Sequence, residues 1–345
     1  MHAGLNRKVR HPLGLTAEFP VERGVAQGAV ESQWVYSNFI EGLSVQLKAA
    51  GVGVTIAGRK VPLLMYADDI VFLATTPTEL VRMNAIATKF ARQHRFQFNG
   101  QKSGVMAYGV SRAERKRVTD MEWELFGEPV LVTDEYAYLG TATPSSAAQS
   151  SSWSAHVEAS IKKAERSSAD LLWVCRADHG IRPRTAITLW QSLVRPQLEY
   201  ASELWSGQTT VALARAAEQV QMVFLRRVLG LHANGSETLI RAEVGCEPLA
   251  DRWAKLKLGY WRRIFNAEGG RLLRHVGESR HAEWVASGGR GYGRRGWMHT
   301  AHDQLHRHGL GEAWDNTALV TEMTIGEWKD RVYGAVDAAT YHPPR

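Results

Sequence analysis

Two adjacent carboxylates, Asp68 and Asp69, stand between two apolar runs, Val61–Tyr66 and Ile70–Ala74. Placing charge next to apolar strands is costly unless the charge is solvated or bound by a cation. Carboxylate oxygens are the ligands that a hard cation such as Mg²⁺ prefers, and a projecting turn can present them to it. The alternative interpretation is an ordinary polar turn, because short acidic motifs often occur without a function.

The apolar runs on either side of the two acids predict a β-hairpin. Asp68 and Asp69 would lie at its tip, with Val61–Met65 antiparallel to Ile70–Ala74. Helices are expected on both sides of this hairpin, over Glu31–Ala50 and Thr76–Arg95. Further strands are expected at Phe96–Phe98 and Ser103–Tyr108, around an Asn99-Gly100 turn, and at Tyr136–Gly140.

The segment Tyr66-Ala67-Asp68-Asp69, in its apolar frame, resembles the catalytic hairpin of reverse transcriptases. Three other segments resemble motifs of the same family and follow in the family's order: Arg23–Gly28, Asn99–Ser103 and Tyr138–Gly140. Four short motifs in the correct order are far more specific than any one of them. The resemblance is to a non-LTR (LINE-type) retrotransposon or a related retroelement.

This resemblance implies an RNA-directed DNA polymerase that transfers nucleotides with two Mg²⁺ ions. Asp68 corresponds to the principal metal ligand of the family, and Asp69 to the weaker, supporting ligand. Lys102 corresponds to the lysine that lies near the triphosphate, where it can protonate the leaving pyrophosphate.

The other motifs imply contacts with the substrates, which are an RNA template, a DNA primer and deoxynucleoside triphosphates. Gln27 and Gly28, together with Tyr66, would line the nucleotide and template site. The primer end would be held by the turn Tyr138, Leu139 and Gly140.

The resemblance breaks at the N-terminus. Family members carry another metal-binding Asp on a strand well upstream of the Gln-Gly loop, but the 23 residues before Gly24 contain no Asp. Glu18 and Glu22 are too close to the loop to replace it. The sequence therefore predicts an N-terminally truncated copy that is inactive as given. After Gly28 the family's Cys-Pro-Leu-Ser-Pro is replaced by Ala-Val-Glu-Ser-Gln, which keeps only the Ser.

The expected fold class is α+β, with an incomplete antiparallel palm followed by a helical, thumb-like domain. The expected parts are an irregular remnant at 1–23, a partial palm at 24–142, a Ser-, Ala- and Pro-rich linker at 143–152, and a mainly helical domain at 153–345. Amphipathic spacing predicts four long helices in that domain, at Trp153–Arg176, Pro183–Trp205, Val211–Leu229 and Pro248–Phe265. Most of its Trp residues lie on the apolar stripes, which favours core packing.

The chain is basic, with 42 Lys and Arg against 35 Asp and Glu, and this suits a polyanionic partner without requiring one. Gly288–Trp297 resembles Arg-Gly segments that bind single strands, with Tyr292 and Trp297 available to stack on bases; the alternative is a surface loop. Basic residues on the predicted helices could contact phosphates or form a solvated face: Arg226, Arg227, Lys255, Lys257, Arg262 and Arg263.

The remaining observations concern the cellular compartment in which the protein is expected. Two cysteines exclude a disulfide framework. No secretory signal is visible in Met1–Pro20, and the apolar region Val61–Ala74 is too short to span a bilayer. An intracellular protein of the nucleus or cytoplasm, neither secreted nor in a membrane, is expected.

Two rival interpretations stay open. The chain could be a non-enzymatic retroelement remnant that binds nucleic acid or a protein partner through its basic helical tail. It could also be an interaction protein built on that tail, in which case partner binding would survive deletion of residues 1–142. An in-frame upstream region with an Asp-bearing strand would favour the enzyme, and stop codons there would favour the remnant.

Overall fold

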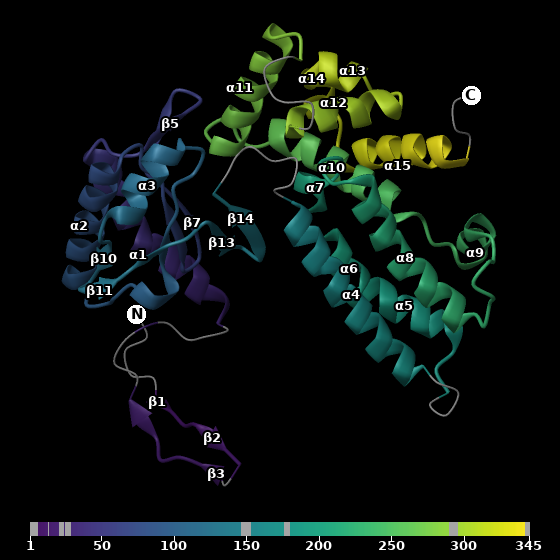
Figure 1. The fold of residues 1–345 in the computed structure, drawn as a ribbon, viewed down its shortest axis with the longest axis horizontal. Coiled ribbons are helices and arrows are strands. Elements are labelled where there is room, and N and C mark those ends of the chain that lie inside the picture. The colour runs from purple at the N-terminus through teal and green to yellow at the C-terminus, as the bar shows by residue number, and fades with distance from the viewer. Residues whose placement is uncertain are drawn as a thin grey trace. The chain divides into compact units, whose positions relative to one another are not determined.

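The computed structural model of the chain describes residues 6–12, 14–20, 24, 29–145, 153–175, 180–289 and 296–341. Its fold class is α+β, as predicted, with short strand pairs in the first part and helices after them (Figure 1). The chain folds into two compact units. The first unit comprises residues 1–107 and 111–133, and the second comprises residues 108–110 and 134–345. The domain boundaries expected from the sequence stay predictions.

The first unit is built around two helices, α1 (Val30–Ala49) and α2 (Pro77–Gln93), which pack against each other. Both match the helices expected from the sequence. The α2 helix begins as predicted, because the Thr76 side chain accepts the N–H of Glu79 and proline occupies the first turn. The core beside them consists of buried apolar side chains: Ile40, Leu43, Leu47, Val52, Leu63, Met83, Ala87 and Phe90.

A hairpin pairs β7 (Leu63–Tyr66) with β8 (Asp69–Phe72) and packs on this core. It is preceded by a second hairpin, β5 (Val54–Ile56) with β6 (Arg59–Val61), which the sequence did not predict. Pro62 separates β6 from β7 because it has no N–H to donate to a strand partner. The strand expected from Val61 therefore begins at Leu63. Gly53 lies so close to Pro62 that an added Cβ would meet its Cα at 2.5 Å.

The strand expected at Phe96–Phe98 is wrong, and Asn99-Gly100 is not a hairpin turn. Ring packing holds this segment, since Phe96 contacts Phe39 and Phe90 edge-on. Only Gly104–Val105 of the expected strand Ser103–Tyr108 is extended in a pair. This strand, β9, runs parallel to β12 (Leu131–Val132) instead of pairing antiparallel across the turn.

The rest of the first unit was not predicted from the sequence. It contains α3 (Arg112–Asp120) and the pair β10 (Glu124–Leu125) with β11 (Glu128–Pro129). The segment expected to be irregular, 1–23, holds two short antiparallel pairs: β1 (Asn6–Arg7) with β4 (Phe19–Pro20), and β2 (Arg10–His11) with β3 (Gly14–Leu15).

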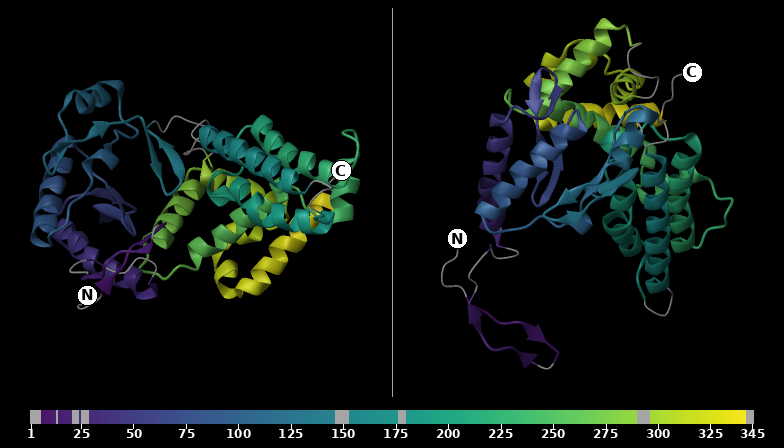
Figure 2. Two further views of the ribbon diagram at one scale, coloured as in Figure 1. Left: turned by 90° about the horizontal axis from the view of Figure 1, so that it is seen from below. Right: turned by 60° about the vertical axis from the view of Figure 1, so that its left-hand side comes forward.

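The second unit begins with a hairpin of β13 (Glu135–Tyr138) and β14 (Thr141–Pro144) and is otherwise helical (Figure 2). Its helices are α4 (Ser154–Val174), α5 (Pro183–Leu193), α6 (Arg195–Glu199), α7 (Ser202–Trp205), α8 (Val211–Val228), α9 (Glu237–Val244), α10 (Leu249–Phe265), α11 (Leu272–Ala286), α12 (Trp297–Arg307), α13 (Glu312–Asp315), α14 (Thr317–Glu322) and α15 (Ile325–Tyr341). The single helix expected at Pro183–Trp205 is broken into α5, α6 and α7. The breaks occur where proline enters the first turn of α6 and where Ala201 adopts a φ of +57°.

Two apolar cores lie in the second unit, and α10 contributes to both. One lies among α4, α5, α6 and α8 and includes Trp190, Trp205 and, from α10, Trp253. The other includes Trp261 of α10 together with side chains of α12 to α15. These four tryptophans confirm the predicted core packing, whereas Trp173 is 58% exposed. Among the helices of the described residues, none has the length and apolar character needed to cross a bilayer.

A lysine is enclosed in the second core. Lys257 of α10 is 0% exposed, and its Nζ donates to Thr300 Oγ1 at 2.8 Å and lies 5.5 Å from the centre of the Trp297 ring. Burial lowers the pKa of Lys257 from 10.5 to about 7, because the charged form loses its hydration.

This burial predicts a pH-dependent stability. Between the folded pKa of about 7 and the unfolded value of 10.5 the unfolded chain binds more protons at Lys257, so the free energy of unfolding rises with pH in this window. Relative to a Lys257→Met variant, the wild type should gain on the order of 4 kcal/mol from pH 7 to pH 10. Denaturant unfolding of both proteins across this range tests the prediction, and parallel curves would contradict it.

Candidate active site

The two carboxylates lie at the tip of the β7–β8 hairpin, which confirms the predicted placement. The register pairs Leu63 with Phe72 and Tyr66 with Asp69, so Ala67 and Asp68 alone form the turn. Asp68 is therefore a turn residue, and Asp69 is the first residue of the returning strand.

The register also decides which side chains lie on each face of the hairpin. Met65 and Ile70 pack towards the core of the first unit. Because side chains alternate along a strand, the next pair, Tyr66 and Asp69, lies on the opposite face. Both residues are exposed, and Tyr66 is exposed by 66%. A tyrosine and a carboxylate therefore share the outer face beside the Asp68 turn.

The turn is strained at Ala67, whose φ is +51°. A side chain in this left-handed region costs about 1–2 kcal/mol, because its Cβ approaches the following carbonyl. Strain of this kind persists only where the surroundings impose it, and it is frequent at functional sites. Here the paired strands on both sides impose it.

Tyr36 of α1 is close enough to the hairpin turn to feel the charge of Asp68, which the sequence did not predict. Burial raises the pKa of its hydroxyl, and the negative charge of Asp68 raises it further. Tyr36 precedes Ile40, Leu43 and Leu47 at helical spacing on the buried stripe of α1. This stripe is the sequence signal that would have placed Tyr36 towards the hairpin.

The donor set at the hairpin suits a hard cation. Asp68 and Asp69 are exposed, and neither takes part in an ion pair in the described part of the chain. Their carboxylate oxygens match the preference of Mg²⁺. No group of three or more His, Cys, Asp or Glu side chains in the described ranges is arranged to hold a metal ion.

The Asn99–Ser103 motif forms a tight turn that ends at Lys102. The Asn99 side chain accepts the N–H of Lys102 at 3.0 Å, and the Ser103 hydroxyl donates to the Asn99 carbonyl at 2.8 Å. Gly100 is buried against Glu128, where an added Cβ would meet the Glu128 Cβ at 2.8 Å. Asn99, Gly100 and Ser103 therefore have structural roles, and they place Lys102 on the surface.

The Tyr138–Gly140 motif forms the turn of the β13–β14 hairpin, since Tyr138 pairs with Thr141. Leu139 and Gly140 both have a positive φ, +48° and +74°. Within the same unit, the Tyr200 hydroxyl donates to the Leu139 carbonyl. An added Cβ at Gly140 would lie 3.4 Å from the Tyr200 ring. The expected short strand at Tyr136–Gly140 is confirmed as far as Tyr138.

Tyr200 is itself fixed to the helices of the second unit. Its carbonyl accepts the indole N–H of Trp205 at 2.8 Å and lies 3.4 Å from His156 Nε2. Tyr200 is 61 residues from Leu139 in the sequence, so no local pattern could have indicated this contact.

Several predicted residues lie elsewhere or play other roles. Gln27 and Gly28 lie outside the described residues, as do Tyr292 and most of the Arg-Gly segment. Trp297 is engaged within the second unit. Its ring lies against Trp261 at 6.2 Å, and its indole N–H donates to the Glu203 carbonyl at 2.8 Å.

The basic residues predicted on the helices are mostly engaged within the fold. Lys257 is enclosed, Lys255 pairs with Glu247 and Asp337, and Arg262 donates to the Met323 carbonyl at 2.7 Å. Arg226 donates to the Gly235 carbonyl. Only Arg227 and Arg263 of this group are exposed.

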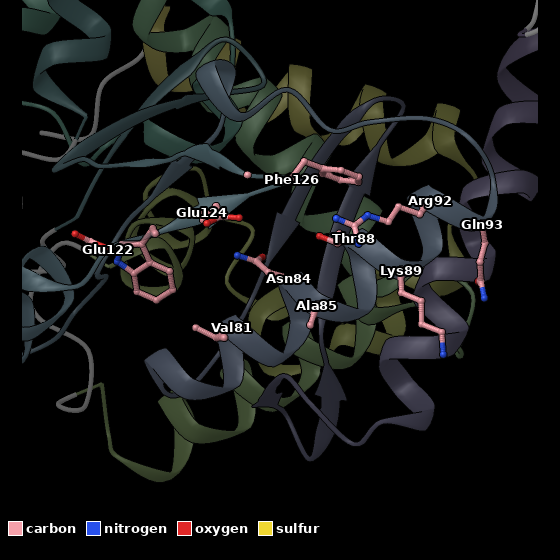
Figure 3. A pocket seen from close by; sticks show the side chains of 12 residues that line it. Val81, Asn84, Ala85, Thr88, Lys89, Arg92, Gln93, Glu122, Glu124 and Phe126 are labelled. Atoms are coloured by element: carbon pink, nitrogen blue, oxygen red, sulfur yellow. The ribbon is translucent and has the colours of Figure 1, made fainter.

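A cavity of about 650 Å³ in the first unit is lined by α2 and by residues 122–124, 126 and 127 (Figure 3). The α2 wall includes Asn84 and Lys89, and the opposite wall includes Glu124 and Phe126. Neither Asp68 nor Asp69 lines it. The candidate site is thus an open hairpin surface, separate from this cavity.

Comparison with known proteins agrees with this geometry. Residues 7–143 match the family described as reverse transcriptase (RNA-dependent DNA polymerase). The chain is also 24% identical over 238 residues, 68% of its length, to the retrovirus-related Pol polyprotein from type-1 retrotransposable element R2 of Popillia japonica. It spans about a third of that polyprotein, 31%. Between residues 7 and 143 the chain therefore carries a reverse transcriptase domain of the retrotransposon kind.

Proposed function

We propose that the chain contributes the palm of an RNA-directed DNA polymerase, with Asp68 and Asp69 as its metal-binding carboxylates. The observation that carries this proposal is the hairpin register, which leaves both acids exposed at a strained turn within the matched segment. The Tyr36 hydroxyl beside Asp68 adds a polar group to the same place.

Each residue has a definite task in this proposal. A bound pair of Mg²⁺ ions would neutralise charge on the phosphates that react. Asp68 would hold the metals, Asp69 would assist, and Lys102 would donate a proton to the departing pyrophosphate. Tyr66 would lie beside the template and nucleotide with Gln27 and Gly28. The turn Tyr138, Leu139 and Gly140 would hold the primer end.

In this proposal Asp68 and Asp69 hold the metals from one side only. The sequence has no Asp before Asp68, whereas the two-metal arrangement clamps the reacting phosphate between ligands on both sides. Catalysis of phosphoryl transfer consists mainly of positioning and electrostatic stabilisation. Both would be incomplete, so we propose that these residues by themselves do not synthesise DNA.

Primer extension on an RNA template tests this proposal. With purified protein and Mg²⁺, the 345-residue chain should give no extension above background, and an Asp68→Ala variant should match it. Extension that disappears in Asp68→Ala would contradict the predicted inactivity while supporting the assigned site. Extension that persists in Asp68→Ala would contradict the site itself.

A second prediction concerns the turn proposed to hold the primer. Tyr200→Phe removes the donor to the Leu139 carbonyl and should weaken the turn by about 1 kcal/mol, the value of a typical hydrogen bond. Hydrogen exchange at the β13–β14 amides should accelerate roughly fivefold. Tyr108→Phe, at another exposed tyrosine, is the matched control. Unchanged exchange in Tyr200→Phe would show that this bond does not hold the turn.

A further inference from the structure

A second cavity, of about 730 Å³, lies between α10 and α15, wholly within the second unit. Gly259, Tyr260 and Arg263 form part of the α10 wall, and Lys329 and Tyr333 form part of the α15 wall. The two helices pack directly on each other, so the groove is a fixed feature of the second core.

The lining carries more positive than negative charge, with five Lys or Arg side chains against two Glu. Three of the five cations have partners. Lys255 pairs with Glu247 and Asp337, Arg262 donates to a backbone carbonyl, and Arg271 pairs with Glu268.

The other two cations have no ion-pair partner among the described residues and are available to an anionic ligand. Arg263 and Lys329 are exposed, and no ion pair involves either of them within the described ranges. They stand on different helices, so two separate anionic groups along the groove could be neutralised.

Aromatic rings stand next to these cations. The Tyr333 ring has two lysines over it, with Lys329 Nζ 5.2 Å and Lys255 Nζ 4.7 Å from its centre. The Tyr260 ring meets Trp297 edge-on with centroids 5.8 Å apart, which fixes its orientation. Cations that follow a backbone, together with rings on which bases can stack, are the recurring means of binding a single-stranded polynucleotide.

We propose that this groove binds single-stranded nucleic acid, with Arg263 and Lys329 on phosphates and Tyr260 against a base. A double helix is too wide and stiff to enter a groove between two packed helices. The proposal rests on the proposed function only in expecting a polynucleotide substrate, and it involves none of the palm residues.

The groove offers variants that should leave the fold intact. Gly259 faces open space, since an added Cβ would meet no atom within 4 Å. Gly259→Leu should therefore fill the groove while improving the helix propensity of α10. Arg263→Gln and Lys329→Gln remove one charge each. Lys162→Gln, at an exposed residue of α4 outside the groove, is the matched control for loss of charge.

Fluorescence anisotropy with a labelled 12-nucleotide RNA, titrated at several salt concentrations, measures the effect. Gly259→Leu should weaken binding at least tenfold. Arg263→Gln and Lys329→Gln should each reduce the slope of log K against log salt by about 0.7, the value for one phosphate contact on a single strand. Lys162→Gln should leave the slope unchanged, and blunt duplex RNA should bind more weakly than the single strand.

Three results would overturn the proposal. These are wild-type binding by Gly259→Leu, an equal loss of slope in Lys162→Gln, and complete competition by ATP at concentrations that occupy a mononucleotide site. Asp68→Asn separates this proposal from the palm assignment, because it should leave single-strand binding unchanged. A failure of the groove variants would therefore leave the proposed polymerase function standing.

Discussion

The pairing of Tyr66 with Asp69 across the β7–β8 hairpin is the interaction on which the candidate site depends. A slip of the register by one residue would turn the core side chains of the hairpin outwards and the outer ones inwards. The burial of Leu63 and the packing of Ile70 against α1 and α2 oppose such a slip. Apolar packing on one face thus fixes two carboxylates on the other, and the strain at Ala67 is the local cost.

The second unit depends on a different constraint: the helix α10 contributes side chains to both of its apolar cores. Trp253 anchors the helix in one core and Trp261 in the other. Lys257, between them, is buried without a carboxylate partner in the described ranges. Its amine donates to Thr300 and lies over the Trp297 ring. The faces of α10 that are left uncovered line the α10–α15 groove.

The parts of the fold that depend on local patterns could be predicted from the sequence. Thr76 and Pro77 mark a helix start by their chemistry, and the apolar runs around Asp68 mark a hairpin by their length. The wrong predictions concern segments whose conformation is determined by contacts with residues distant in the sequence. Phe96 and Phe98 have the composition of a strand, but they are held by rings from other elements. The amphipathic run Pro183–Trp205 is helical by pattern, yet Ala201 interrupts it with a positive φ.

In the candidate site, too, local features could be predicted from the sequence and long-range contacts could not. The acids and their turn were predictable, because motif and hairpin coincide within a few residues. Tyr36 and Tyr200 were missed, since each reaches its partner through the tertiary fold. Lys255 and Arg262 had a basic helix pattern that suggested phosphate contacts, but internal acceptors bind them instead.

Paramagnetic Mn²⁺ in place of Mg²⁺ offers the most direct measurement of the central claim, that the hairpin acids form a metal site. In methyl-labelled protein, titration with Mn²⁺ should broaden the signals of Ala67 and Ile70 first. Asp68→Asn should abolish the selective broadening. Broadening that leaves Ala67 and Ile70 unaffected, or that is unchanged in Asp68→Asn, would contradict the account.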